Sequence, residues 1–107
     1  MLENTKAQMR KGTLEFSILL VIAQGEIYSS DILKELKKSD LIVVEGTLYP
    51  ILSRLRKEDL LEYKWEESKS GPPRKYYKLT TKGEETINKL KGVWEDLHKS
   101  INSLIKK

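Results

Sequence analysis

Cysteine is absent from this 107-residue chain, and His98 is its only histidine. Without cysteine there can be no disulfide, no thiolate nucleophile and no cysteine-ligated zinc. One histidine cannot build a histidine-rich metal site or a conventional catalytic triad. No other grouping of acid, base and nucleophile is recognisable in the sequence. We therefore expect a protein that is not an enzyme and that holds no metal and no cofactor.

Long apolar runs are also missing. The most apolar stretch, residues 16–23, is far shorter than the roughly 20 residues that span a bilayer, and no secretory signal pattern precedes it. We therefore expect a cytoplasmic protein with no membrane segment. A chain of this length is expected to form one small domain, whose modest core would gain from self-association. The net charge of +4 favours an anionic partner, although the distribution of charge matters more than its sum.

Apolar residues at helical spacing predict a first helix over residues 10–24. It is apolar nearly all round, which indicates burial on most sides, and Gly25 supplies its stop. Residues 1–9 have mixed polarity, and we expect them to form a loosely ordered arm or the first turn of this helix.

Two further short helices are predicted after this one. The second begins at Ser29 or Ser30, either of which could cap it, and ends in the polar run 37–40. The third covers residues 45–58 and contains Pro50, early enough for few backbone hydrogen bonds to be lost. Three short helices with tight connections match the helix-turn-helix pattern.

A hairpin is predicted after the third helix. Residues 60–67 and 74–79 are expected to be strands, and residues 69–73, with sequence KSGPP, the loop between them. Strand alternation places Arg74 and Lys78 on one side of the hairpin and Lys75 on the other. One side can then pack while the other side and the tip meet phosphates. Residues 69–82 contain five cations and no acid: Lys69, Arg74, Lys75, Lys78 and Lys82. Such a run is usually only a solvated surface, but directly after a helix-turn-helix it indicates a DNA-binding wing.

The third helix carries candidate DNA contacts on the side opposite its leucines. Thr47 and Tyr49 lie near its start, where base-edge or phosphate contacts fall in helix-turn-helix docking, although Tyr49 could instead pack against the wing. Arg54 and Lys57 lie further along, where contacts to the DNA backbone are expected. The full set on this side is Thr47, Tyr49, Ser53, Arg54 and Lys57. A second basic group before the first helix could touch flanking phosphates or simply aid solubility: Lys6, Arg10 and Lys11.

The last part of the chain predicts a helix with an apolar seam. Thr80 or Thr81 is expected to cap it, with Glu84 or Glu85 as the capping-box partner. The seam has the spacing of heptad a and d positions and consists of Ile87, Leu90, Trp94, Leu97, Ile101 and Leu104. It could pack on its own domain, but three short helices leave little surface to cover so long a stripe. We therefore expect this helix to pair with a second copy.

Trp94 is the unusual member of the seam. Two copies of it could simply fill a dimer interface, because tryptophan carries a large apolar area. Alternatively they could wall a cavity that sandwiches a flat aromatic ligand, with His98 one turn beyond.

Three stretches of the sequence resemble the PadR family of bacterial transcriptional regulators. They are KGTLEFSILLVIAQG at 11–25, EGTLYPILSRLRKEDLLEYKW at 45–65 and GPPRKYYKLTTKG at 71–83. The resemblance implies a mainly α (α+β) fold: a winged helix-turn-helix DNA-binding domain over residues 1–80 and a C-terminal dimerisation helix over residues 81–107, together one compact unit. It also implies a homodimer that represses transcription from a pseudo-palindromic operator on double-stranded DNA. The short C-terminal helix is similar to that of the family's smaller subgroup.

The resemblance also assigns residues. It places Thr47, Tyr49 and Arg54 on the recognition helix, and it places Gly71, Arg74 and Lys75 in the wing. Trp94 stands where multidrug-responsive members stack planar drugs, and Phe16 and Leu20 are similarly placed to line that space. The segment Tyr28–Asp31 and the residue Asp59, which stands where a glycine is common, depart from the family pattern. Two alternatives remain open: a regulator that needs no ligand, and a protein-interaction module that has lost DNA binding.

Overall fold

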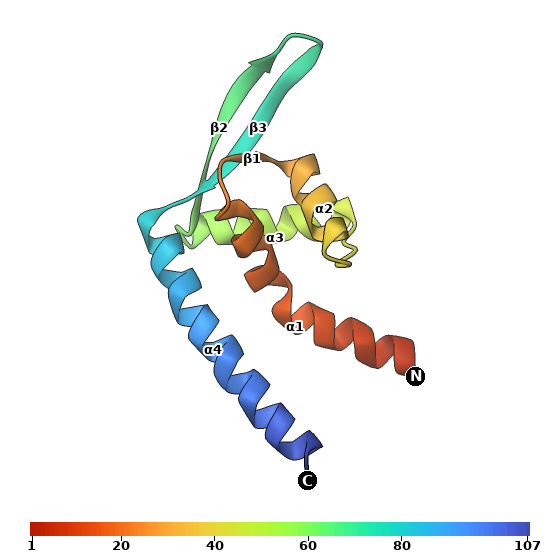
Figure 1. Ribbon diagram of the computed structural model, residues 1–107. Coiled ribbons are helices and arrows are strands. Elements are labelled where there is room, and N and C mark those ends of the chain that lie inside the picture. The colour runs from red at the N-terminus through yellow and green to blue at the C-terminus, as the bar shows by residue number, and fades with distance from the viewer.

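The computed structural model describes residues 1–107 and has the mainly helical, winged architecture that the sequence predicts. Its four helices are α1 (Leu2–Ile22), α2 (Ser29–Lys38), α3 (Glu45–Lys57) and α4 (Thr81–Ile105). Its three strands are β1 (Ile27–Tyr28), β2 (Leu61–Ser68) and β3 (Gly71–Leu79). In Figure 1 the β2–β3 hairpin projects upward from the helices, and α4 runs downward from its base.

Helix α1 is longer than the sequence suggested, because it begins at Leu2 rather than near residue 10. Of the two alternatives for residues 1–9, the loose arm is wrong and the helical one holds: residues 2–9 belong to the helix, supported by an ion pair between Lys6 and Glu3 at 3.6 Å. Figure 1 shows that α1 bends, so that its N-terminal half leaves the body of the molecule. The Thr13 and Ser17 hydroxyls donate to backbone carbonyls one turn earlier, a pattern that bends helices.

Helices α2 and α3 end in the same way. Each is followed by an aspartate with positive φ, Asp40 at 61° and Asp59 at 69°. The next residue, Leu41 or Leu60, donates its N–H back to a carbonyl in the last turn at 2.9–3.0 Å, which satisfies a carbonyl that the helix leaves free. Asp59, which stands where a glycine is common in the family, thus takes a conformation that glycine usually adopts. Aspartate tolerates this conformation better than most residues.

The three strands form one antiparallel sheet with the order β1-β3-β2. Strand β1 was not expected from the sequence, since it has only two residues. The predicted loop 69–73 is corrected: only Lys69 and Ser70 lie outside the strands. Ser68 pairs with Gly71 and Glu66 with Arg74, so the two prolines 72 and 73 on β3 face the single residue 67 on β2. This bulge accommodates prolines, which have no N–H to give to the ladder.

The core lies where α1, α2, α3 and the lower end of the hairpin meet. It contains 14 buried apolar side chains: Ile18, Leu19, Val21, Ile22, Ile32, Leu36, Leu48, Leu52, Leu55, Leu60, Leu61, Tyr77, Leu79 and Ile87. All but Ile87 precede α4 in the chain. Helices α2 and α3 both turn leucines and isoleucines toward this core, with Leu33 and Ile51 partly buried at its edge.

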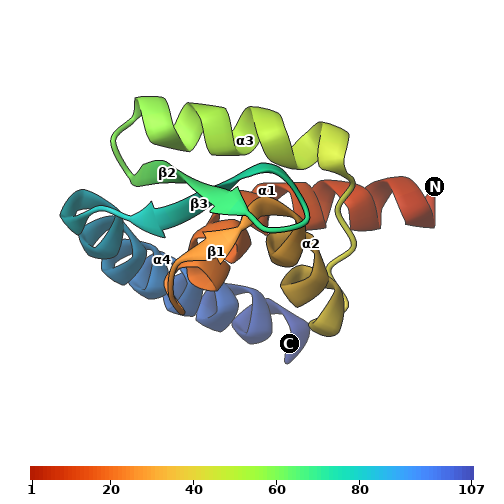
Figure 2. The same ribbon diagram turned by 90° about the horizontal axis from the view of Figure 1, so that it is seen from above.

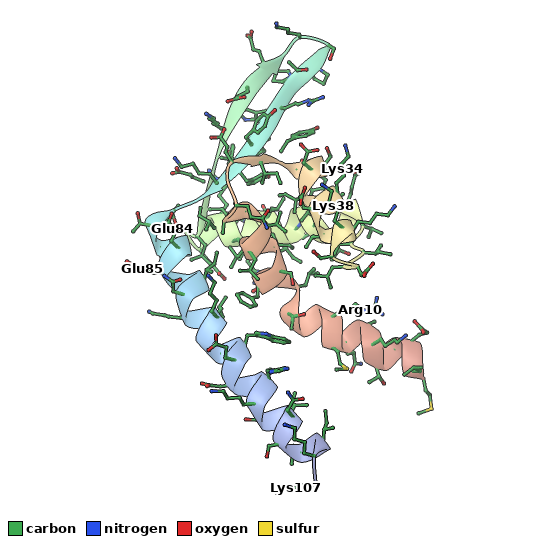
Figure 3. The ribbon with its side chains drawn as sticks, viewed as in Figure 1. Arg10, Lys34, Lys38, Glu84, Glu85 and Lys107 are labelled. Atoms are coloured by element: carbon green, nitrogen blue, oxygen red, sulfur yellow. The ribbon has the colours of Figure 1, made fainter.

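The start of α4 is fixed to the end of α3. The Thr80 hydroxyl accepts the Gly83 N–H at 3.0 Å and donates to the Asp59 carbonyl at 2.6 Å. A Cβ at Gly83 would collide with the Leu60 carbonyl, so only glycine lets the helix approach this closely. Because Gly83 occupies the third helical position, the expected capping-box glutamate is absent there, and Glu84 and Glu85 lie on the outer side of α4 (Figure 3).

The molecule is elongated, with principal extents of 57, 32 and 22 Å. Its radius of gyration is 15.7 Å, whereas a compact chain of this length would have about 13 Å. The excess comes from the lower half of α4 and the N-terminal half of α1, which both project from the body (Figure 1).

Candidate nucleic-acid interface

The exposed side of α3 carries three lines of side chains, because successive helical residues are turned by roughly 100°. On one flank of the buried leucines lie Tyr49 and Arg56, next to the hairpin. On the other flank lie Thr47 and Arg54, next to α1. The outermost line contains Ser53 and Lys57. All five residues predicted on this helix are exposed, but they do not all point the same way.

Tyr49 is half exposed and its position is fixed from outside its own helix. Its hydroxyl lies 3.2 Å from the Ser29 Oγ at the start of α2. The expectation that Ser29 or Ser30 caps α2 is wrong. Both serines lie inside the helix, and Tyr28 occupies the cap position without a side-chain hydrogen bond. The Tyr49 ring is thus held at the surface between α2 and the hairpin.

Arg54 is drawn toward α1, where its guanidinium forms an ion pair with Glu15. Thr47 lines an apolar groove of about 520 Å³ between the N-terminal half of α1 and the segment 41–44. Arg10 and Lys11 lie on the α1 wall of the same groove. The second basic group therefore belongs to this side of the molecule, away from the hairpin.

The hairpin has two distinct sides. One side faces α3 and carries Tyr63, Trp65, Lys75 and Tyr77, as the pairing of Tyr63 with Tyr77 and of Trp65 with Lys75 requires. The predicted separation of Lys75 from Arg74 and Lys78 is confirmed by this register. We call the side with Lys75 the α3-facing side, because α3 lies on that side (Figure 2), across the base of the hairpin (Figure 1). At its base, burial raises the pKa of the Tyr77 hydroxyl, and the neighbouring Tyr49 and Tyr63 raise it further.

The opposite, far side of the hairpin is a network of ion pairs. Lys64 lies 3.1 Å from Glu26 and 3.2 Å from Glu66, and Lys78 lies 3.5 Å from Glu62. Hydrogen bonds to the two glutamates raise the pKa of Lys64. The charges of Lys64 and Lys78 on this side are therefore largely cancelled.

Three cations of the hairpin and α3 instead rest on aromatic rings and form no ion pair with a carboxylate. The Lys75 ammonium lies 3.9 Å from the centre of the Tyr63 ring, and the Arg56 guanidinium lies 4.6 Å from the same centre. The Arg74 guanidinium lies 4.9 Å from the centre of the Tyr28 ring. Lys69 stands at the exposed hairpin tip beside Gly71. Charge available to an anion therefore lies on α3, at Lys75 on the α3-facing side, at Arg74 on the far side and at Lys69 at the hairpin tip.

The sequence reasoning missed three residues of this surface: Arg56, Tyr63 and Trp65. Their positions depend on how the hairpin register meets the flank of α3. The one available signal was strand alternation, which puts Tyr63 and Trp65 on the same side of their strand. The register then places that side together with Lys75.

The apolar seam of α4 changes its surroundings along the helix. Ile87 is 3% exposed and belongs to the chain's own core, which corrects its assignment to a dimer interface. Leu90 is partly buried against the core, as are Phe16 and Leu20 of α1. Beyond it, Trp94 is 47%, Leu97 49% and Ile101 48% exposed, and Leu104 is more exposed still.

Trp94 is accompanied by His98 one turn later. The two rings have centres 6.1 Å apart and planes inclined by 30°, so they are stacked. The His98 Nε2 lies 3.1 Å from the Asn102 side-chain nitrogen. In Figure 3 no other element of the chain lies beside this half of α4.

Neither a metal nor a membrane site is evident. No three histidine, aspartate or glutamate side chains gather where they could hold a metal ion. No helix combines the length and the apolar character needed to cross a membrane.

Comparison with known proteins identifies what this surface belongs to. Residues 18–89 match the transcriptional regulator PadR-like family. A PadR-like transcription factor from Bacteroides fragilis is 53% identical, with a TM-score of 0.79 over 94% of this chain and 98% of its own. A PadR-like transcriptional regulator from Bacillus cereus is 40% identical, with a TM-score of 0.81 over 94% and 98% of the two chains.

A structure of Bacillus subtilis PadR in complex with operator DNA is also similar. It has 22% identity and a TM-score of 0.66 over 72% of this chain and 45% of its own. At this identity the similarity concerns the fold alone.

Proposed function

Because the chain belongs to the PadR-like family of transcriptional regulators, we propose that it is a cytoplasmic homodimer that represses transcription by binding a pseudo-palindromic operator. Helix α3 would enter the major groove and the hairpin would lie on the adjacent backbone. The observation that carries this proposal is the concentration of unneutralised cations on α3 and the hairpin. The fold shared with a relative whose structure contains operator DNA supports it.

Within this interface the outermost side chains of α3, Ser53 and Lys57, would reach deepest. Tyr49 and Thr47 would contact the DNA from the two flanks, and Lys69, Arg74 and Lys75 would bind phosphates from the hairpin. Gly71 would let the hairpin tip approach the backbone. On DNA, the Arg54 guanidinium would either leave Glu15 and bind a phosphate or keep its ion pair with Glu15, because a carboxylate partner weakens its attraction for a phosphate.

The half-exposed seam from Trp94 to Leu104 supports the homodimer. Four large apolar side chains in a row on a projecting helix form a surface that soluble monomers seldom leave uncovered. Because Thr80 and Gly83 fix α4 to the end of α3, pairing two α4 helices would also fix the distance between two α3 helices. Successive major grooves on one face of the duplex lie about 34 Å apart, which sets the required spacing.

The proposal is tested by two double variants that remove the same charge. Lys57→Ala with Lys75→Ala removes two unneutralised cations, whereas Lys64→Ala with Lys78→Ala removes two that are paired with glutamates. Fluorescence anisotropy on the DNA upstream of the chain's own gene should show a much larger loss of affinity for the first. The slope of log affinity against log salt should fall by about 0.9 for each phosphate that the variant no longer neutralises. Equal losses for the two variants would contradict the assignment of this surface, and no binding to any duplex would favour a protein-interaction module.

A second proposal concerns a ligand. The half-exposed Trp94 ring stacked with His98 supports a site for a flat aromatic molecule between two α4 helices. Such a ligand would release the operator only if it binds the released form of the dimer more tightly. In a Trp65→Phe background, which leaves Trp94 as the only tryptophan, a planar fluorescent cation should quench the emission and lower operator affinity. Absence of quenching would leave a regulator that needs no ligand.

A further inference from the structure

Lys75 stands out among the cations of the hairpin because aromatic rings surround its ammonium group. The Nζ lies 3.9 Å from the centre of the Tyr63 ring, 5.6 Å from that of Trp65 and 5.7 Å from that of Tyr77. Lys75 is half-buried and forms no ion pair. Its side chain is thus confined by rings on the α3-facing side of the hairpin.

A ring and a carboxylate confine a cation with different consequences. A carboxylate cancels the charge that it holds, as Glu62 does for Lys78 on the far side of the same hairpin. A ring attracts the cation through its quadrupole and leaves the net charge in place. Lys75 is therefore both positioned and free to bind an anion.

The Tyr63 ring holds a second cation from another element. The Arg56 guanidinium, on the hairpin flank of α3, lies 4.6 Å from the ring centre. Two like charges gathered at one ring repel each other, and an anion bound near both relieves the repulsion. The duplex backbone supplies closely spaced phosphates to a protein that places a helix and a hairpin on it.

We propose that Tyr63 is a positioning residue for DNA binding, which holds Arg56 and Lys75 together so that they bind the phosphate backbone between the major groove and the hairpin. This assignment rests on the proposed DNA-binding function. Tyr63 itself makes no contact with the DNA. It fixes the hairpin cation relative to the α3 cation and thereby sets where the backbone must pass.

The test compares two substitutions of Tyr63. Tyr63→Phe keeps the ring and should bind operator DNA within about twofold of the unmodified protein. Tyr63→Leu removes the ring and should weaken binding about tenfold, because neither cation then has a ring to rest on. The salt slope should fall with it, by about 0.9 for each phosphate that is no longer neutralised. A purely structural defect would lower the active fraction and leave the slope unchanged.

A double-mutant cycle decides whether Tyr63 acts through the two cations. In the Arg56→Ala, Lys75→Ala background, Tyr63→Leu should weaken binding by less than about twofold, because nothing remains for the ring to position. An equal effect of Tyr63→Leu in both backgrounds overturns the proposal. If Arg56→Ala with Lys75→Ala binds like the unmodified protein, the proposal also fails, while the Lys57 contribution to DNA binding can still be measured separately.

A measurement on the unmodified protein covers the case in which Tyr63→Leu does not fold. The ε-methylene protons of Lys75 should be shifted upfield by the ring currents more than those of Lys78, whose ammonium pairs with Glu62. The difference should persist on the operator, where the Lys75 amide should also shift. Coincident ε-methylene shifts for the two lysines would overturn the proposal.

Discussion

The two halves of α4 carry one apolar seam but meet different surroundings. In the first half, Ile87 is buried in the chain's own core, and Gly83 lies against the α3–β2 connection. In the second half the same spacing continues through Trp94, Leu97 and Ile101, which remain half exposed. The difference teaches that heptad spacing identifies the apolar side of a helix without identifying what covers it. One half of the seam stabilises the chain itself, and the other half is available to a second copy.

Charges placed in the second half should have the largest effect. Leu97→Glu with Ile101→Glu would bury two carboxylates in the proposed dimer, at a cost of several kcal/mol for each ion. Since each 1.4 kcal/mol is about tenfold in a dissociation constant, the variant should be monomeric at micromolar concentration and lose operator binding. Sedimentation equilibrium and anisotropy measure the two effects.

The matched control for this variant is Lys99→Gln with Ser103→Glu. It changes the charge by the same two units on the exposed side of α4, away from the seam. It should remain dimeric and should bind the operator with only a small loss. A monomeric control, or a dimeric Leu97→Glu, Ile101→Glu variant, would contradict the proposed division of the helix.

Shortening a side chain in the first half should weaken the fold itself. Ile87→Ala leaves a cavity in the core and should lower the free energy of unfolding by about 2–5 kcal/mol. Because Ile87 is covered by its own chain, the loss should appear in urea denaturation at every protein concentration. Ile101→Ala should instead act through association, so its effect should depend on concentration. Identical concentration dependence in the two variants would remove the distinction.

Much of the fold and of the candidate site could be predicted from the sequence. The features that could not be predicted have one physical reason in common. The helices and the seam follow from local spacing, and the positive φ of Asp59 agrees with the glycine that is common at this position in the family. The side that Arg74, Lys75 and Lys78 each take on their strand also followed, because alternation fixes it, but the register with the partner strand did not.

The errors concern residues whose partners are distant in the chain. Ser29 was expected to cap α2, but its hydroxyl lies against Tyr49, 20 residues later. Ile87 was assigned to a second copy, although elements at the other end of the chain bury it. The pairing of Arg56 and Lys75 on Tyr63 was missed because it requires both the sheet register and the flank of α3. Local patterns do not contain such contacts.

The smallest predicted effect comes from replacing one glycine in each half of α4 by alanine. Gly83→Ala would place a methyl group against the Leu60 carbonyl, and the backbone shift that follows should lower the free energy of unfolding by about 1–3 kcal/mol. Gly92→Ala meets nothing within 4 Å and should raise it by up to about 1 kcal/mol, because alanine is the better helix former. Urea denaturation of the two variants should therefore show changes in the free energy of unfolding of opposite sign for the same substitution in one helix. A stabilised Gly83→Ala protein would mean that α4 does not need its close approach to the end of α3. The position of the dimer seam relative to α3 would then be less firmly fixed than we propose.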